Sequence, residues 1–484
     1  MATAHTPHAP PVYRPDGEIR PVDRVPARER WSWALYDFAN TMFSMNVGTL
    51  FFTVWFVTDL GGTNTQLGIA NSLSSAMVAL SIPILGAVSD ARRRRKPWVV
   101  GFTLAAVAMT FMIGVLGHTA VPLVGLGVEN GAAAGTLASG AGMLTILVAF
   151  VIANYAYQGA LPFYNAMMPE LAPPAEQGRL SGLGAALGYV GSIAGVLVGM
   201  LFFAGGIPGI VDAPDGLVSA LRGIVPFAAH GGRVAVYAPT ALMFLLFALP
   251  LFFCRDHNPA PSGQPVRWRQ AFDDLRATLR DSKRYPGARR FIITSLLYQD
   301  AMGTIITVMA LYAVEAVGFA KGFETTMFVM LTVPAVLGSY VIGIMSDRRG
   351  PKWTLQFVLL SWIVLLVGMI VAPTKAIFLC IGVGIGLIFG GIGTAERPMM
   401  LSLVPDEEAG RFFGLMVLSA RAAAIVGPLV WALAVDGLMP FAGKKIAYRA
   451  GLATLTLAMV GAWWLLRGVP DVPRGERAVV RIAA

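Results

Sequence analysis

The chain contains about twelve apolar segments, and each is long enough to cross a bilayer as a helix, which takes about 20 residues. Their approximate ranges are 31–57, 67–88, 97–118, 141–166, 181–205, 235–254, 290–314, 324–345, 354–372, 376–396, 412–436 and 447–467. Only 13% of the residues are charged and 56% are hydrophobic, whereas about a quarter of the residues in soluble domains are charged. We therefore predict an all-α membrane protein with twelve transmembrane helices.

The twelve segments form two groups of six on either side of a polar stretch. The predicted parts are a disordered cytosolic tail (1–30), an N-terminal six-helix half (31–254), a cytosolic linker (255–289), a C-terminal six-helix half (290–467) and a second cytosolic tail (468–484). The tail at 1–30 is Pro-rich and polar and has no apolar core of a signal peptide. In the linker, Trp268, Phe272, Leu275 and Leu279 recur at helical spacing. This pattern predicts an amphipathic helix on the membrane surface.

Lysine and arginine are distributed unequally between the two sets of loops. If both termini are cytosolic, 29 of the 37 fall on the inner side and 7 on the outer side, with Arg421 inside a span. Because basic loops stay in the cytosol, this asymmetry favours cytosolic termini. Lacking a targeting pattern, the chain is expected in a bacterial inner (plasma) membrane. The basic residues form no groove-like cluster with interleaved aromatics, so we expect no nucleic-acid partner.

Three short motifs occur once in each half, in the same order. GAVSDARRRRKPW (86–98) matches GIMSDRRGPKW (343–353), LAPPAEQGRLSG (171–182) matches LVPDEEAGRFFG (403–414), and DFANTMFS (37–44) matches DAMGTIIT (300–307). Three ordered matches indicate two equivalent six-helix halves. Duplicated halves around a site near the membrane midplane are typical of secondary transporters.

The hairpin GxxxDxxxRRK between the second and third spans resembles the signature of the major facilitator superfamily. Further stretches resemble the vacuole-effluxer-like family of amino-acid effluxers and bacterial permeases: WALYDFANTMF, FYNAMMPELAP, LGYVGS, YQDAMGTI and FFGLMVLSARAAAIVGPL. The resemblance covers nearly the whole chain outside the tails and implies the major facilitator fold, with two pseudo-symmetric halves. Where that family leads us to expect a Ser-Arg pair, this chain has Glu396-Arg397, so no substrate is carried over.

The two hairpins are expected to act as latches between rocking halves. Small Gly residues allow close helix approach, and each Asp would face a helix N-terminus and an Arg across the halves. Asp90 would face Arg411, and Asp347 would face Arg179. The predicted latch and gate residues are Gly86, Asp90, Arg94, Arg179, Gly343, Asp347, Arg348, Glu396, Arg397 and Arg411. Alternatively, the Arg run only fixes topology and contacts lipid.

Ionisable residues inside spans are costly and mark candidate sites. Polar stripes at helical spacing on the first and seventh helices predict a substrate cavity, because the superfamily resemblance implies that these two helices line it. The predicted substrate and proton-binding residues are Asp37, Asn40, Thr41, Ser44, Asn154, Tyr157, Gln158, Asn165, Tyr298, Asp300, Thr304, Thr307 and Arg421. Helix packing remains an alternative for the stripe on the fourth helix. Arg421 would bind a substrate carboxylate or neutralise Asp37 or Asp300, and Glu396 with Arg397 would form a gate pair.

Carboxylates on one side and an arginine on the other suit a zwitterion such as an amino acid. A desolvated Asp also takes up protons readily, so we expect protons as the coupling ion. We expect a small-molecule substrate, contact with lipid, a monomer, no enzymatic activity and no metal or cofactor. Two alternatives remain. One is a permease for another organic solute, namely a peptide, a sugar derivative or a drug-like cation. The other is a lipid-translocating or sensing protein on the same fold.

Overall fold

The computed structural model is almost entirely helical. It describes residues 12–13, 19–20, 25–62, 64–92, 94–120, 140–207, 211–212, 214–226, 228–229, 231–255, 285–319, 323–372, 374–405 and 408–471. Two short antiparallel pairs supply the strands of the described residues: β1 (Val12–Tyr13) with β2 (Ile19–Arg20), and β3 (Gly206–Ile207) with β4 (Val211–Asp212). The amphipathic helix predicted in the linker lies outside the described residues.

Helices of the first half occupy residues 27–252. They are α1 (Ala27–Phe43), η2 (Ser44–Leu50), α2 (Phe51–Val54), η3 (Trp55–Asp59), α3 (Asn64–Arg92), α4 (Lys96–Ala120), α6 (Gly140–Ala166), α7 (Met168–Leu171), α8 (Gln177–Ala204), α9 (Asp215–Ile224), η5 (Arg233–Val236) and α10 (Tyr237–Phe252). The first helix begins at Ala27, four residues before the predicted start of its span. The part of the first unit that follows α1 contains two π-helical segments, η2 and η3, with the short α2 between them.

Helices of the second half occupy residues 286–467. They are α12 (Pro286–Tyr312), η6 (Ala313–Val317), α13 (Phe323–Arg349), α14 (Pro351–Val371), α15 (Lys375–Phe389), α16 (Gly391–Leu403) and α17 (Ala409–Arg467). The 59 residues of α17 include Gly443 with φ 74°. Because a residue with positive φ cannot continue a right-handed helix, Gly443 separates the eleventh and twelfth membrane-crossing units.

Taken together, the helices give the twelve predicted units in two sets of six. Eight helices in the described part of the chain are long and apolar enough to span a membrane by these two measures alone, and one of them covers Leu429–Arg467. The units outside that set include the first and the seventh, which carry the polar stripes.

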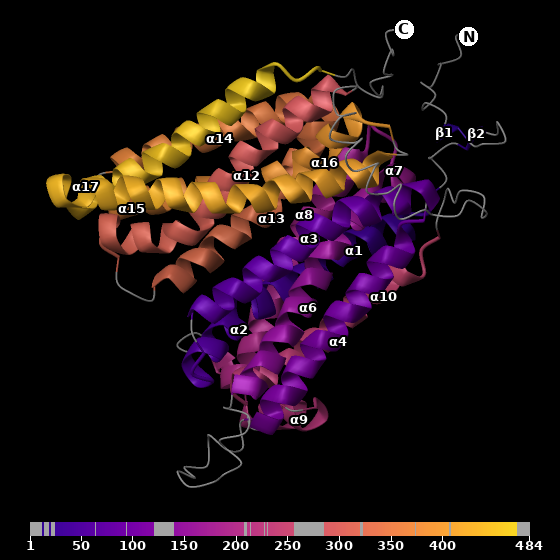
Figure 1. The fold of residues 1–484 in the computed structure, drawn as a ribbon, viewed down its shortest axis with the longest axis vertical. Coiled ribbons are helices and arrows are strands. Elements are labelled where there is room, and N and C mark those ends of the chain that lie inside the picture. Colours follow the sequence, from indigo (N-terminus) through magenta and orange to yellow (C-terminus); the bar gives the residue numbers. More distant parts are fainter. Residues whose placement is uncertain are drawn as a thin grey trace.

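The two halves meet at the end of the molecule where α1 begins and α17 ends, called the terminal end, and their helices diverge towards the other end (Figure 1). Across the halves, α8 packs against α13 and α3 packs against α17. The α8–α13 contact is close because a Cβ on Gly182 would lie 2.7 Å from the Ser339 carbonyl oxygen and 2.9 Å from Gly343 Cα. Glycine is required there so that the two backbones can touch.

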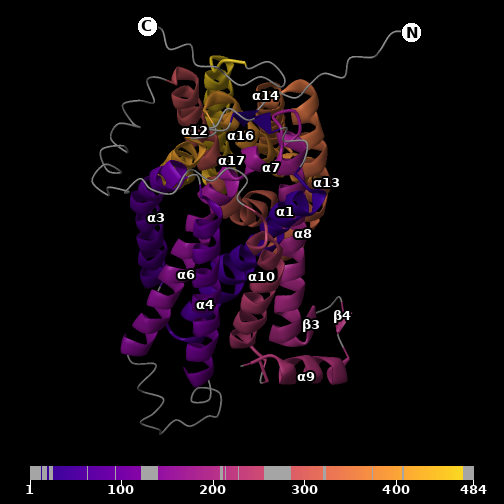
Figure 2. The same ribbon diagram turned by 90° about the vertical axis from the view of Figure 1, so that its right-hand side faces the viewer.

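Helix α9 lies across the ends of the first-half helices rather than parallel to them (Figure 2). Its Leu217 and Ile224 side chains are exposed, by 51% and 79%, whereas Val218 is buried. A helix with apolar side chains exposed at the end of a membrane bundle fits the interface between headgroups and acyl chains.

Candidate functional site

An ion pair between Asp37 and Arg397 joins the two halves inside the bundle. The Arg397 Nη1 atom donates to Asp37 Oδ2 at 2.9 Å, and Nη2 lies 3.5 Å from Oδ1. Asp37 lies on α1, about 15 Å along the helix from its start at a rise of about 1.5 Å per residue, and Arg397 lies on α16. The two side chains are 7% and 16% exposed. A buried pair of this kind leaves an uncompensated charge when either partner is removed.

Two aromatic rings lie beside this pair. The rings of Trp33 and Tyr164 stack with their centroids 4.3 Å apart and their planes at 10°. The Arg397 guanidinium carbon lies 5.7 Å from the Trp33 ring centroid and 5.6 Å from the Tyr164 ring centroid, within cation–π range. Trp33 Nε1 donates to the Tyr164 carbonyl oxygen at 2.9 Å and fixes the stack. The rings therefore hold the guanidinium facing Asp37.

Glu396 and Arg397 have different hydrogen-bond partners. Glu396 is buried, and its Oε2 accepts from Gln299 Nε2 of α12 at 2.7 Å. Consecutive residues on a helix do not share a face, so Arg397 reaches α1 while Glu396 reaches the seventh unit. Their different hydrogen-bond partners place the two side chains on contacts with different helices. Their joint role as a gate pair stays a prediction.

The seventh unit carries a further buried carboxylate, Asp300. Asp300 accepts a hydrogen bond from the Gly427 backbone N–H of α17 at 2.7 Å. A Cβ on Gly427 would lie 2.4 Å from Thr304 Oγ1, so this backbone packs directly on the predicted stripe. Among the described residues, the buried Asn40 Oδ1 and Thr304 Oγ1 atoms find no hydrogen-bond partner. Buried polar atoms without a hydrogen-bond partner are uncommon in folded proteins, which makes these two atoms candidates for a ligand or a water.

Thr41, another residue of the polar stripe on α1, makes its hydrogen bonds within the first half. Thr41 Oγ1 lies 2.6 Å from the carbonyl oxygens of Asp37 and Gly188, which ties α1 to α8. Ser44 begins the first π-helical segment.

Polar side chains of α6 form a network with α3. Asn154 Nδ2 donates to Ser74 Oγ at 2.8 Å and to Asn71 Oδ1 at 3.2 Å, and its Oδ1 accepts from Gln158 Nε2 at 2.9 Å. Tyr157 stacks on Phe43 at 4.9 Å. These contacts resemble helix packing more than an open binding surface. Asn165 and Tyr298 are half-buried and buried, respectively.

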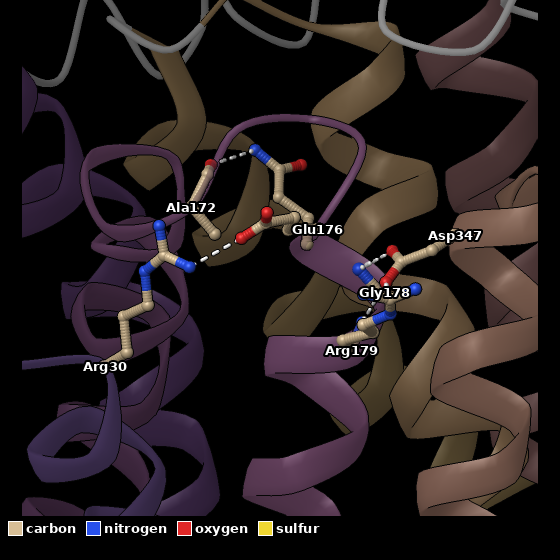
Figure 3. Close-up of polar contacts among 7 residues, drawn as sticks. Arg30, Ala172, Glu176, Gly178, Arg179 and Asp347 are labelled. Atoms are coloured by element: carbon tan, nitrogen blue, oxygen red, sulfur yellow. Dashed lines mark hydrogen bonds and ion pairs between the residues drawn. The ribbon is translucent and has the colours of Figure 1, made fainter. Parts of the chain in front are cut away.

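The second hairpin contacts the other half at the terminal end. Asp347 accepts from the backbone N–H groups of Gly178 (2.7 Å) and Arg179 (2.9 Å), and Arg179 Nε lies 3.4 Å from Asp347 Oδ2 (Figure 3). Both N–H groups belong to the first turn of α8, where a carboxylate is favoured. This is the placement that the internal repeat predicts for Asp347.

Arg30 of α1 binds Glu176 just before α8, so the same turn is anchored on both sides (Figure 3). Gly343 lies at the α8–α13 contact, whereas Arg94 and Arg348 are exposed and Gly86 is buried. The side chains of Asp90, Thr307, Arg411 and Arg421 lie outside the described residues. The role of Asp90 with Arg411 and that of Arg421 therefore stay predictions.

Three important groups had little signal in the sequence. Arg95 forms a buried ion pair with Glu170 at 2.8 Å, although it reads as one member of a basic run. Trp33 and Gln299 belong to the site through their contacts with Arg397 and Glu396. In the sequence, Trp33 and Gln299 are marked only by their position in a span close to Asp37 and Asp300, respectively.

Comparison with curated proteins finds distant full-length relatives. The chain is 24% identical over 409 residues to the MFS-type transporter YxiO of Bacillus subtilis, covering 83% of this chain and 87% of YxiO. It is 22% identical over 382 residues to the multidrug resistance protein MdtG of Proteus mirabilis, covering 78% and 80% of the two chains.

Solved structures share the fold at low sequence identity. The human organic anion transporter MFSD10 matches with a TM-score of 0.62 at 15% identity, covering 92% of this chain and all of that one. FucP in the outward conformation matches with a TM-score of 0.62 at 14% identity, covering 92% of this chain and 98% of that one. A bacterial homologue of the iron transporter ferroportin in its outward-facing state matches with a TM-score of 0.62 at 13% identity, covering 91% of this chain and 98% of that one.

The family model of the Major Facilitator Superfamily matches residues 36–428 and, in a second match, 291–480. These ranges cover both halves, and the fold has the twelve units in two sets of six that the repeats predict. The narrower resemblance to the vacuole-effluxer-like family stays a prediction. The chain belongs to the Major Facilitator Superfamily of transporters.

Proposed function

We propose that this protein is a secondary active transporter of a small zwitterionic solute, such as an amino acid, and that a proton is the coupling ion. The observation that carries the proposal is the Asp37–Arg397 pair, which links α1 to α16 across the halves. Opening the terminal end of the molecule requires this pair to separate. A substrate that compensates both charges lowers the cost of that separation.

An amino acid supplies both charges at once. Its ammonium group would take the place of Arg397 at Asp37, and its carboxylate would take the place of Asp37 at Arg397. Each buried charge then keeps a partner, whereas a neutral sugar would leave both uncompensated. The Trp33–Tyr164 stack beside the guanidinium would receive the apolar part of the solute.

Protonation of Asp37 would act on the same contact. A neutral carboxyl attracts Arg397 far less than a carboxylate, so proton uptake would favour separation of the halves at this point. Asp300 and Glu396 are the other buried carboxyl groups of the site. The expected setting is a bacterial inner membrane with both termini in the cytosol, on the basis of the lysine and arginine distribution.

The test is substrate-driven proton movement in proteoliposomes that contain a pH-sensitive dye, with amino acids added one at a time. Wild type is compared with Asp37→Asn and with Asp436→Asn, a control at an exposed carboxylate of α17. We expect flux in wild type and the control and none in Asp37→Asn. Flux with organic cations alone would favour the drug-like substrates named for MdtG relatives. No flux with any solute in folded protein would refute the proposal.

A further inference from the structure

A small cavity lies in the C-terminal half, at the end of the molecule opposite the terminal end. Its volume is about 240 Å³, and it is bounded by α12 with η6, the connection between α14 and α15, and α17. Three basic side chains line it: Lys375, Lys445 and Arg449. The three come from two separate places in the chain, the start of α15 and the region after Gly443. None of the cavity-lining residues within the described part of the chain is acidic.

Two of the three cations are held in place by the protein. Arg449 Nη2 donates to the Ala372 carbonyl oxygen at 3.3 Å. The Lys375 ammonium lies 5.4 Å from the Phe319 ring centroid. A guanidinium has five N–H donors and an ammonium has three, so these contacts leave donors for a ligand in the cavity.

Three positive charges around one cavity favour an anion over a neutral ligand. Lys375 and Lys445 are exposed to solvent, and Arg449 is half-buried. Like charges that share a small cavity repel one another, and the repulsion grows as water is displaced. An anion with several acceptor oxygens relieves it by accepting charge-assisted hydrogen bonds from all three side chains. Thr374 and Tyr312 add polar atoms to the lining.

We propose that this cavity binds a phosphate group, either free or as part of a phospholipid headgroup. Apolar residues next to two lining residues in the chain are exposed: Val371, which precedes Ala372, by 65%, and Ile446, which follows Lys445, by 57%. Basic side chains between transmembrane helices can hold an anionic headgroup through charge-assisted hydrogen bonds, while apolar surface beside them contacts the acyl chains. The bound group ties the seventh unit, the start of α15 and the last helix together.

The first measurement is the thermal unfolding of the purified full-length protein in a neutral detergent, titrated with inorganic phosphate. Sodium chloride holds the ionic strength constant, so that screening does not change. We expect a saturable rise in Tm for wild type, because a ligand that binds the native state stabilises it. Lys445→Gln is expected to weaken the apparent affinity by about tenfold.

The matched control is Lys444→Gln, which removes the same charge from the neighbouring exposed residue that does not line the cavity. It is expected to titrate as wild type does. A further variant is Arg449→Lys. It keeps the positive charge at this position, so it can be used where complete removal of the charge and of the Ala372 contact would impair folding.

The second measurement is native mass spectrometry of protein from nanodiscs that contain phosphatidylglycerol or phosphatidylcholine. Retained phosphatidylglycerol that is lost in Lys445→Gln and kept in Lys444→Gln would identify the headgroup as the source. A phosphate-dependent Tm rise without retained lipid would identify free phosphate. Equal behaviour of the two lysine variants in both measurements, or no response in either, would overturn the proposal.

Discussion

Asp37 and Arg397 are 360 residues apart in the chain, yet their charged groups meet at 2.9 Å between the two halves. The contact joins a carboxylate of the first unit to a guanidinium of the tenth. It brings together a residue from a repeated polar stripe and one from the tenth helix, where this chain departs from the expected Ser-Arg pair.

The stability of the protein is expected to depend on both partners together. Asp37→Asn and Arg397→Gln should each lower the free energy of unfolding by about 3–5 kcal/mol, because each leaves a buried charge unpaired. The double variant should lose less than the sum of the two. Unfolding in mixed micelles gives all three values, and simple additivity would show that the pair is not coupled.

The α8–α13 contact is expected to control which end of the molecule is open. In Gly182→Ala, the new Cβ would clash with Ser339 and Gly343 backbone atoms, so the terminal end should open more often. The readout is cross-linking between Arg179→Cys and Arg348→Cys in a background without the two native cysteines. We expect slower cross-linking than in the parent.

The control for that experiment is Gly101→Ala in α4, where an added Cβ meets no atom within 4 Å. Its cross-linking rate should equal that of the parent. Unchanged cross-linking in Gly182→Ala would contradict a role of this contact in closing the terminal end.

Two ion pairs of the first half are expected to differ strongly in their contribution to the free energy of unfolding. Arg95–Glu170 is buried, with side chains 4% and 12% exposed, whereas Arg233–Asp59 is 27% and 38% exposed. Glu170→Gln should therefore cost about 3 kcal/mol or more. Asp59→Asn should cost about 1 kcal/mol or less, because water and salt screen the pair. Equal losses of stability in the two variants would contradict this assignment.

Asn154 is expected to act on stability rather than on substrate affinity. Its amide is used by Asn71, Ser74 and Gln158 within the first half. Asn154→Ala should lower the free energy of unfolding by about 1–3 kcal/mol. The KM for transport, measured on the folded fraction, should stay unchanged, and a large rise in KM would return Asn154 to the substrate site.

Much of the fold follows from the sequence because it depends on local composition and on the repeats. Apolar runs predict the helices, and the matched hairpins predict that Asp347 lies against Arg179 and the start of α8. The partner of Arg397 does not follow in this way. Its choice depends on how the two halves rest against each other, and the sequence pattern around Glu396 and Arg397 favours neither residue as the one that reaches across.

The burial of Arg95 within the basic run does not follow from the sequence either. Arg92 and Arg94 are exposed, while Arg95 is 3% exposed and paired with Glu170. The run looks uniform in the sequence, because all of its members are arginine. Only the position of α7, which brings Glu170 to the turn between α3 and α4, distinguishes one from the others.

The π-helical winding of η2 changes how the first helix can be interpreted. In a π-helix each backbone hydrogen bond spans five residues instead of four, so side chains beyond Ser44 turn by a smaller angle per residue than in an α-helix. A helical wheel drawn with 3.6 residues per turn therefore holds for Asp37, Asn40 and Thr41 and fails from Ser44 outward. Side chains in residues 44–59, nearly half of the first unit, therefore lie on other sides of the helix than regular periodicity assigns to them.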